Sequence, residues 1–171
     1  MYKIKQFFRR IHNLYRWFPI IWKDQDWDDH YIWEILKFKL TNQADYIAKH
    51  DRYVLAQRDA WLMRLCVKLI DKVQTEYYGA EYMDYEETEF EFTPSDKCDG
   101  CKELKIIELW DNLDEYYKKY PLIHKRVMKE RMPFKTDNKR GVAINIGHIN
   151  HSRARKLLFK ILEENIERWW D

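Results

Sequence analysis

Two cysteines separated by two residues are the first candidates for chemistry in this chain. Cys98 and Cys101 enclose an Asp-Gly pair, and this spacing on a turn is typical of one half of a structural zinc site. His148 and His151 would complete a Cys₂His₂ ligand set in three dimensions. One cysteine pair with two loosely spaced histidines is a weak motif, so an inert loop is favoured, while zinc and then a redox pair stay open. No other cofactor is expected.

Four carboxylates form two pairs with the spacing of one helical turn, Glu86 with Glu89 and Glu108 with Asp111. On helices they would resemble the acidic helices of all-α nucleotide pyrophosphohydrolases, in which carboxylates hold Mg²⁺ for phosphate hydrolysis. Residues 86–92 fit a helix poorly, so solvated acidic faces are favoured over catalysis. The sequence also has no glycine-rich phosphate loop, nucleophile elbow or metalloprotease helix motif. An enzyme is therefore the less favoured class.

A third group combines tryptophan, aspartate and arginine near both ends of the sequence. Residues 17–29 contain three tryptophans and four aspartates, and the pattern returns as Trp169-Trp170-Asp171. An indole N–H needs an acceptor, and an aspartate can supply one or cap a helix. If the first and last helices pack together, these residues would form one ligand-binding group. Its members are Arg9, Arg16, Trp22, Asp24, Asp26, Trp27, Arg153, Arg168, Trp169 and Trp170.

This group suits a small nucleotide-like ligand, because aromatic faces stack on bases and arginine forks grip phosphates. In the alternative interpretation the tryptophans are core residues, and the arginines pair with Asp26, Asp28 and Asp171 as structural ties. The net charge is only +2, so bulk electrostatics give no support for general nucleic-acid binding.

Length and composition indicate one helical domain. The 171 residues suffice for one hydrophobic core, and only four glycines and four prolines interrupt the chain. We expect an all-α, single-domain bundle of five or six helices over 1–171, with 79–101 as a less certain insertion containing a short extended acidic and aromatic arm near 80–100. The three cysteines are an odd number and no secretory segment precedes them, which favours a reducing cytoplasm.

Apolar spacings of three and four residues locate the helices. Pro19 is expected to end the first one, Cys66 to lie in the core of the third, and residues 133–142 to form a mobile loop. The predicted helices are 2–18, 28–48, 51–77, 103–119, 122–131 and 150–169.

The first helix carries one apolar stripe and several basic residues. This composition suits either a core-packing helix or a helix lying on a membrane surface. Core packing is favoured, because aspartates follow directly after the helix. No apolar run approaches the roughly 20 residues of a membrane span.

Several of these motifs together resemble a widespread family of small proteins of tailed bacteriophages, a family with no established activity. The resemblance covers about the first seventy and the last twenty residues. The motifs are Trp17-Phe18-Pro19, Trp22-x-Asp24-x-Asp26-Trp27-Asp28, Leu36 to Leu40, Arg155 to Phe159 and Ile166 to Asp171. It implies expression in the cytoplasm of an infected bacterium, where small phage accessory proteins often bind components of host defence or regulation.

The sequence thus predicts a phage accessory protein that acts by binding in the host bacterial cytoplasm. It would sequester a nucleotide signal or a host defence or regulatory protein. Two alternatives stay open: a structural or assembly adaptor of the phage, and a Mg²⁺-dependent nucleotide pyrophosphohydrolase using Glu86, Glu89, Glu108 and Asp111. Assembly into a homo-oligomer also stays open.

Overall fold

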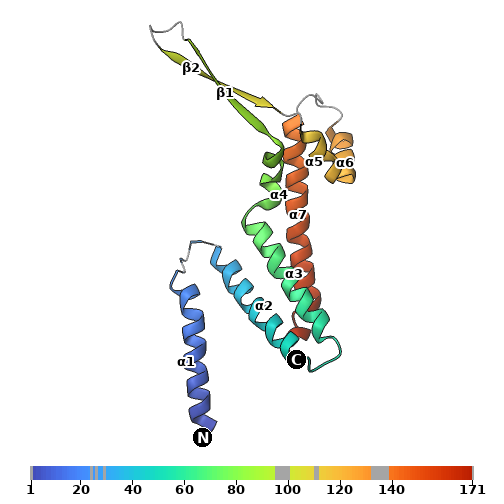
Figure 1. Ribbon diagram of the computed structural model, residues 1–171. Helices are drawn as coiled ribbons and strands as arrows, with labels where there is room; N and C mark the ends of the chain where they lie inside the picture. The colour runs from blue at the N-terminus through green and yellow to red at the C-terminus, as the bar shows by residue number, and fades with distance from the viewer. Residues whose placement is uncertain are drawn as a thin grey trace. The chain divides into compact units, whose positions relative to one another are not determined.

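The chain is mainly helical in the computed structural model, as the sequence predicts (Figure 1). The structure describes residues 2–170 apart from a few positions and short segments, and it does not describe four further side chains. The positions left out are Asp24, Asp26, Asp29, 95–100, Trp110, Asp111 and 132–138, and the side chains are those of Thr88, Glu108, Arg131 and Trp170.

Within these residues, seven α-helices accompany one β-hairpin and two 3₁₀ turns. The helices are α1 (Tyr2–Ile21), α2 (His30–His50), α3 (Ala56–Gln74), α4 (Tyr77–Ala80), α5 (Leu113–Lys119), α6 (Pro121–Arg131) and α7 (Lys139–Asn165). The 3₁₀ turns are η1 (Glu81–Tyr85) and η2 (Arg168–Trp170), and the strands are β1 (Glu87–Pro94) and β2 (Lys102–Leu109). No described helix has both the length and the apolar character needed to cross a membrane.

The chain divides into two compact units, and each is considered by itself. The first contains residues 1–74 and 158–171, and the second contains residues 75–157, so one boundary falls inside α7. The prediction that 1–171 forms a single domain stays a prediction.

The core of the first unit lies mainly between α2 and α3. Ala56, Ala60, Met63 and Cys66 of α3 are completely buried, which confirms Cys66 as a core residue. Burial also raises the pKa of the Cys66 thiol to about 11. Further core side chains are Leu40, Ala44 and Ile47 of α2, Leu69, Ile70 and Val73 of α3, and Leu158, Ile161 and Leu162 of α7.

The two ends of α2 explain why the observed helix boundaries differ from the predicted ones. At its start, Oδ1 of Asp28 accepts a hydrogen bond of 2.9 Å from the backbone N–H of His30, as expected of a helix cap. At its end, Asp51 adopts a left-handed backbone with φ 42°, which stops the helix. The prediction that α3 begins at Asp51 was therefore wrong.

Helix α1 differs most from its predicted role. It continues through Pro19 to Ile21, and the N–H of Trp22 still donates a 2.9 Å hydrogen bond to the Phe18 carbonyl. None of its residues is buried, so the prediction that its apolar stripe packs into the core was wrong.

The second unit is built around a tyrosine-rich core. Tyr82 of η1, Tyr116 and Tyr117 of α5, and Ile146 of α7 are all buried there. Gly147 allows a close helix approach, since a Cβ at this position would lie 2.7 Å from the Tyr78 carbonyl oxygen. The last helix begins at Lys139 rather than near 150, and α6 confirms the prediction for 122–131.

Strand β2 overturns the first part of the predicted helix at 103–119, whereas residues 113–119 are helical as predicted and form α5. The two strands pair antiparallel, with Phe90 opposite Ile106 and Phe92 opposite Leu104, and such apolar pairs stabilise a hairpin. The predicted arm near 80–100 is thus one half of the hairpin seen in Figure 1. Of the predicted loop at 133–142, residues 139–142 are helical, and 133–138 lie outside the described residues.

Candidate functional site

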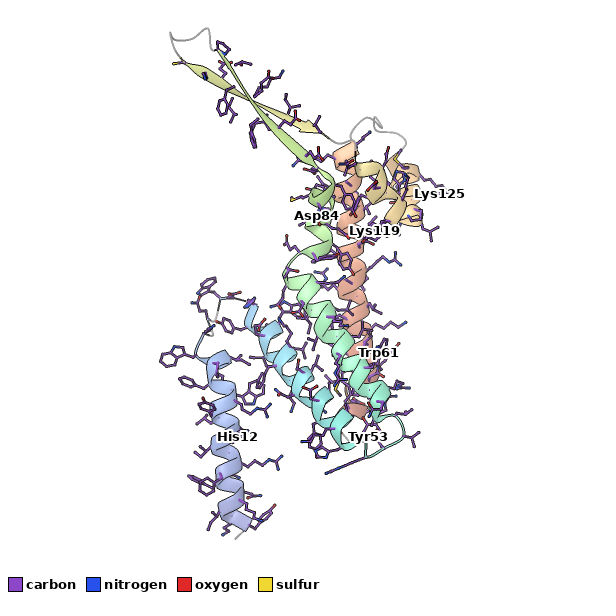
Figure 2. All side chains as sticks on the ribbon, in the orientation of Figure 1. His12, Tyr53, Trp61, Asp84, Lys119 and Lys125 are labelled. Atoms are coloured by element: carbon purple, nitrogen blue, oxygen red, sulfur yellow. The ribbon has the colours of Figure 1, made fainter. Side chains whose placement is uncertain are left out.

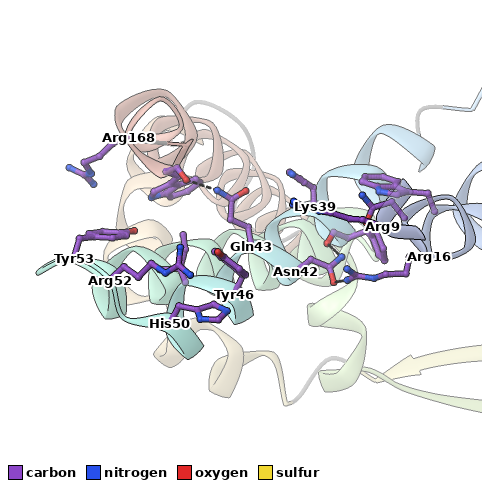
Figure 3. A pocket seen from close by; sticks show the side chains of 15 residues that line it. Arg9, Arg16, Lys39, Asn42, Gln43, Tyr46, His50, Arg52, Tyr53 and Arg168 are labelled. Atoms are coloured by element: carbon purple, nitrogen blue, oxygen red, sulfur yellow. Dashed lines mark hydrogen bonds between the residues drawn. The ribbon is translucent and has the colours of Figure 1, made fainter. Parts of the chain in front are cut away.

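The candidate site is a pocket of about 700 Å³ in the first unit. It lies between α1, α2, the turn after α2, and η2 (Figure 3). Its volume falls within the usual range for small-molecule sites. The lining residues are Arg9, Asn13, Arg16, Trp17, Phe38, Lys39, Asn42, Gln43, Tyr46, Ile47, His50, Arg52, Tyr53, Arg168 and Trp169.

Helix α1 contributes its polar side to this pocket. Arg9, Asn13, Arg16 and Trp17 recur at helical spacing, so they share one side of α1. The guanidinium of Arg16 donates a hydrogen bond to Oδ1 of Asn42 and lies 5.6 Å from the centre of the Phe38 ring. The Trp17 ring meets Phe38 edge to face at 4.6 Å. These contacts attach the last part of α1 to α2.

Helix α2 contributes a polar face with the same periodicity. Lys39, Asn42, Gln43, Tyr46 and His50 follow one another at spacings of three, one, three and four residues. The Tyr46 ring is centred 4.4 Å from the His50 ring. The guanidinium of Arg52, just after the helix, lies 5.7 Å from the centre of Tyr46. Tyr46 is 52% exposed, so about half of its surface is accessible to a ligand.

The C-terminal part of the pocket is buried. Trp169 is 3% exposed, and its backbone carbonyl accepts a hydrogen bond from the side-chain amide of Gln43 (Figure 3). The indole N–H of Trp169 is buried without a hydrogen-bond acceptor among the described residues. A buried donor of this kind usually has a partner, so its acceptor would come from outside the described residues or from a ligand.

Arg168 is held by a buried carboxylate of α3. Asp59 is completely buried, and its Oδ1 lies 3.2 Å from the guanidiniums of Arg168 and Arg58. Its other oxygen accepts a 3.2 Å hydrogen bond from the Tyr53 hydroxyl. Burial, followed by the charge of Asp59, raises the pKa of Tyr53. Asp59 therefore fixes two lining residues of the pocket.

The lining is strongly cationic. It includes Arg9, Arg16, Lys39, Arg52 and Arg168, and none of the described lining residues carries a carboxylate. The charge of Arg168 is paired with the buried carboxylate of Asp59. Arg9 and Arg52 form no ion pair with a described carboxylate. Cations without a local counter-charge, placed beside exposed rings, attract anionic ligands with an aromatic part.

The structure brings together four of the ten residues predicted as a binding group. Arg9, Arg16, Arg168 and Trp169 line the pocket. Trp22 and Trp27 do not, being 75% and 82% exposed. Arg153 belongs to the second unit. Asp24, Asp26 and the Trp170 side chain lie outside the described residues.

The alternative interpretation of the same residues is correct for Trp169 and wrong for Trp22 and Trp27. Trp169 is a core residue, whereas Trp27 is on the surface. The described carboxylate that pairs with Arg168 is Asp59, which neither interpretation had considered. Asp59 lies in the first turn of α3. In the sequence, an aspartate at this position indicates no more than the start of a helix.

The sequence interpretation also missed the polar face of α2. The signal was present, since Lys39, Asn42, Tyr46 and His50 recur every three or four residues. A polar helix face more often contacts solvent than a ligand, so the pattern alone did not indicate a pocket.

The predicted zinc and magnesium sites have no support from the described geometry. Among the described residues, no group of three or more His, Cys, Asp or Glu side chains is placed to hold a metal ion. Cys101 is disulfide-bonded, Cys98 lies outside the described residues, and His148 and His151 belong to α7. The zinc prediction therefore stays a prediction.

The carboxylates proposed to bind Mg²⁺ do not lie on helices. Glu86 precedes β1, Glu89 lies within β1, and Glu108 lies within β2. Glu89 pairs with Ile107 and Glu108 with Thr88, so the two glutamates are not cross-strand partners. Asp111 lies outside the described residues. The described carboxylates of this group therefore do not resemble the acidic helices of nucleotide pyrophosphohydrolases.

Comparison of the chain with protein-family models, curated proteins and solved structures finds no match.

Proposed function

We propose that this protein is a binding protein for a small nucleotide-like anion, which it holds in the pocket between α1, α2 and η2. The observation that carries the proposal is the combination of five Arg or Lys side chains, accessible aromatic rings and no described carboxylate in one lining. Guanidinium groups form paired hydrogen bonds with phosphate oxygens, and tyrosine or tryptophan faces stack on bases.

The side-chain amides of the pocket add base recognition to this scheme. Asn13 and Gln43 line the same space as the cations, and an amide offers both a donor and an acceptor to the edge of a base. Arg9 and Arg52 would contact the phosphates and Tyr46 would stack. The described lining residues include no serine, threonine or cysteine that could act as a nucleophile, so binding without turnover is favoured over hydrolysis.

The proposal extends to the setting that the resemblance to phage proteins implies, in which the protein would act in the cytoplasm of an infected bacterium. There the protein would lower the free concentration of a nucleotide signal used by host defence or regulation. An acidic peptide of a host protein is the other anion that such a pocket would accept.

Binding is tested by calorimetry with nucleoside triphosphates, cyclic mononucleotides and cyclic dinucleotides, with inorganic triphosphate and adenosine as separate halves of the ligand. At least one nucleotide should bind more tightly than either half, and binding should weaken as salt screens the cations. Recovery of the intact nucleotide after denaturation would support sequestration, whereas its conversion to products would support the hydrolase alternative.

A pair of adjacent arginines gives a matched control. Arg9 lines the pocket and Arg10 does not, although both lie on α1 and are exposed. Arg9→Gln should weaken nucleotide binding by about tenfold, the equivalent of one charge-assisted hydrogen bond, and Arg10→Gln should leave it unchanged. Equal affinities for the wild type and Arg9→Gln, or no binding of any nucleotide by the wild type, would overturn the proposal.

A further inference from the structure

Helix α1 presents a continuous apolar stripe that no described residue of its unit covers. The large apolar side chains of the stripe are between 49% and 79% exposed. Ile4, Ile11 and Phe18 lie seven residues apart along the centre of the stripe, which also contains Phe7, Phe8, Leu14 and Tyr15. An exposed apolar surface of this extent usually marks an interaction site.

The orientation of α1 is the reverse of the usual one for a helix in a folded domain. Its contacts with α2 come from the polar side, through Arg16 and the neighbouring Trp17. Arg9 and Asn13, on the same side, line the pocket. Residues seven apart on the opposite side form the apolar stripe. The apolar side thus faces away from the element that positions the helix.

Basic residues border the stripe on both sides. Lys3 and Lys5 flank Ile4, and Arg10 and His12 flank Ile11 in the same way. Because consecutive residues are about 100° apart around a helix, these flanking residues lie on the two edges of the stripe. Figure 2 labels His12 on α1. Tyr2 to Lys23 contains six Lys or Arg residues and no acidic residue.

We infer that α1 lies in the surface of an anionic lipid membrane, with the stripe among the acyl chains and the flanking cations at the lipid phosphates. An apolar face rich in aromatic residues, bordered by Lys and Arg, is the composition of interfacial helices. Anionic headgroups complement both edges at once, since cations on both sides of a helix reach the same headgroup plane. A protein groove would need acidic residues on both of its rims.

The test uses the full chain in a sedimentation assay with two kinds of vesicle, phosphatidylcholine alone and phosphatidylcholine mixed with phosphatidylglycerol. The protein should sediment with the mixed vesicles and remain in solution with the neutral ones, and salt should weaken the binding. Absence from both pellets, or equal binding to both, would overturn the inference.

Variants separate the two parts of the surface. Ile11→Glu, at the centre of the stripe, should abolish vesicle binding. Leu122→Glu on α6 is the matched control, because Leu122 is 82% exposed and lies outside α1; it should bind vesicles as the wild type does. The triple variant Lys3→Gln/Lys5→Gln/Arg10→Gln should reduce partition into the mixed vesicles by about a hundredfold. Vesicle binding that is unchanged in Ile11→Glu or in the triple variant would contradict the assignment of α1 to an anionic membrane surface.

Other occupants of the stripe would be recognised in the same experiments. A dimer in solution that Ile11→Glu dissociates, without any vesicle binding, would assign the stripe to a second copy of the chain and overturn the lipid assignment. Arg9→Gln should bind vesicles nearly normally while losing nucleotide affinity. The vesicle assay and the nucleotide assay can therefore fail independently.

Discussion

The guanidinium of Arg168 lies 3.2 Å from Oδ1 of Asp59, a carboxylate with no exposed surface. The two residues are 109 positions apart, so this ion pair attaches the C-terminal 3₁₀ turn to the first turn of α3. Tyr53 and Arg58 also bind Asp59. This carboxylate is the shared anchor for the C-terminal part of the pocket.

Replacing Asp59 with Ala should lower the free energy of unfolding by about 2–4 kcal/mol. The substitution leaves two guanidiniums and a tyrosine hydroxyl without their acceptor, and the arginines are exposed enough for water to recover part of the loss. Urea denaturation measures the change. Asp45→Ala is the control, because the Asp45–Arg64 pair is on the surface and should contribute less than about 1 kcal/mol. Equal effects of the two variants would contradict the anchoring role.

Trp169 and Trp27 should respond in opposite ways to truncation. Trp169→Ala removes a ring that is 3% exposed, so we expect a loss of about 3–5 kcal/mol in the free energy of unfolding. Trp27 is 82% exposed, and Trp27→Ala should change stability by less than about 1 kcal/mol. Thermal and chemical unfolding of both variants compare them directly. A large loss in Trp27→Ala would show that its ring is covered in solution.

Gly147→Ala should destabilise the second unit. Alanine normally favours a helix by about 1 kcal/mol over glycine, but here its methyl group would lie 2.7 Å from the Tyr78 carbonyl oxygen. The expected net loss is about 1–3 kcal/mol. Gly79→Ala is the matched control, since a Cβ there would meet only the Glu76 Cβ, at the ordinary distance of 3.8 Å. A stability gain in Gly147→Ala would show that the helices separate at little cost.

Stability should decline at alkaline pH. Burial raises the pKa of Tyr117 to about 12, and burial with neighbouring Glu81 raises the pKa of Tyr116 and Tyr120. A hydrogen bond to Glu81 likewise raises the pKa of Lys119 (labelled in Figure 2). Above about pH 10 the unfolded chain releases these protons while the folded chain retains them, so the folded state loses relative stability. The free energy of unfolding should be constant up to about pH 9 and then fall.

A single hydroxyl tests this pH dependence. Tyr116→Phe removes a buried hydroxyl that has no hydrogen-bond partner among the described residues, so stability near pH 7 should be unchanged or slightly higher. The alkaline loss should become smaller by about 1.4 kcal/mol for each pH unit above 10. Tyr117→Phe should instead cost about 1 kcal/mol near pH 7, because the Tyr117 hydroxyl donates a 2.7 Å hydrogen bond to the Lys139 carbonyl.

Hydrophobic periodicity was sufficient to predict the helical class and most helices. It failed at residues 102–109, where Leu104, Ile107 and Leu109 fit a helical stripe as well as a strand. Pairing with 87–94 decides the outcome, and a single segment does not contain that information. At α2 the left-handed Asp51 ended the helix where the sequence had suggested the start of the next one.

The candidate site could be predicted only in part. Arg9, Arg16, Arg168 and Trp169 were grouped from their residue types, and they do line one pocket. The contributions of α2 were missed, because a polar helix face has the same sequence pattern whether it meets solvent or a ligand. Similarly, the periodicity of α1 identified an apolar stripe but contained no information about what the stripe would contact.

The absence of buried residues in α1 has a consequence for its backbone amides. In proteins most helical stability comes from tertiary packing, and among the described residues the side chains of Arg16 and Trp17 attach α1 to α2. Its amide hydrogens should therefore exchange with deuterium through local opening, long before those of the buried segments of α3. Arg9 and Arg16 move with this helix, so the pocket would form and open on the timescale of a helix–coil transition. A ligand that binds the closed pocket would stabilise the helix. It would therefore increase the deuterium protection of Tyr2–Ile21.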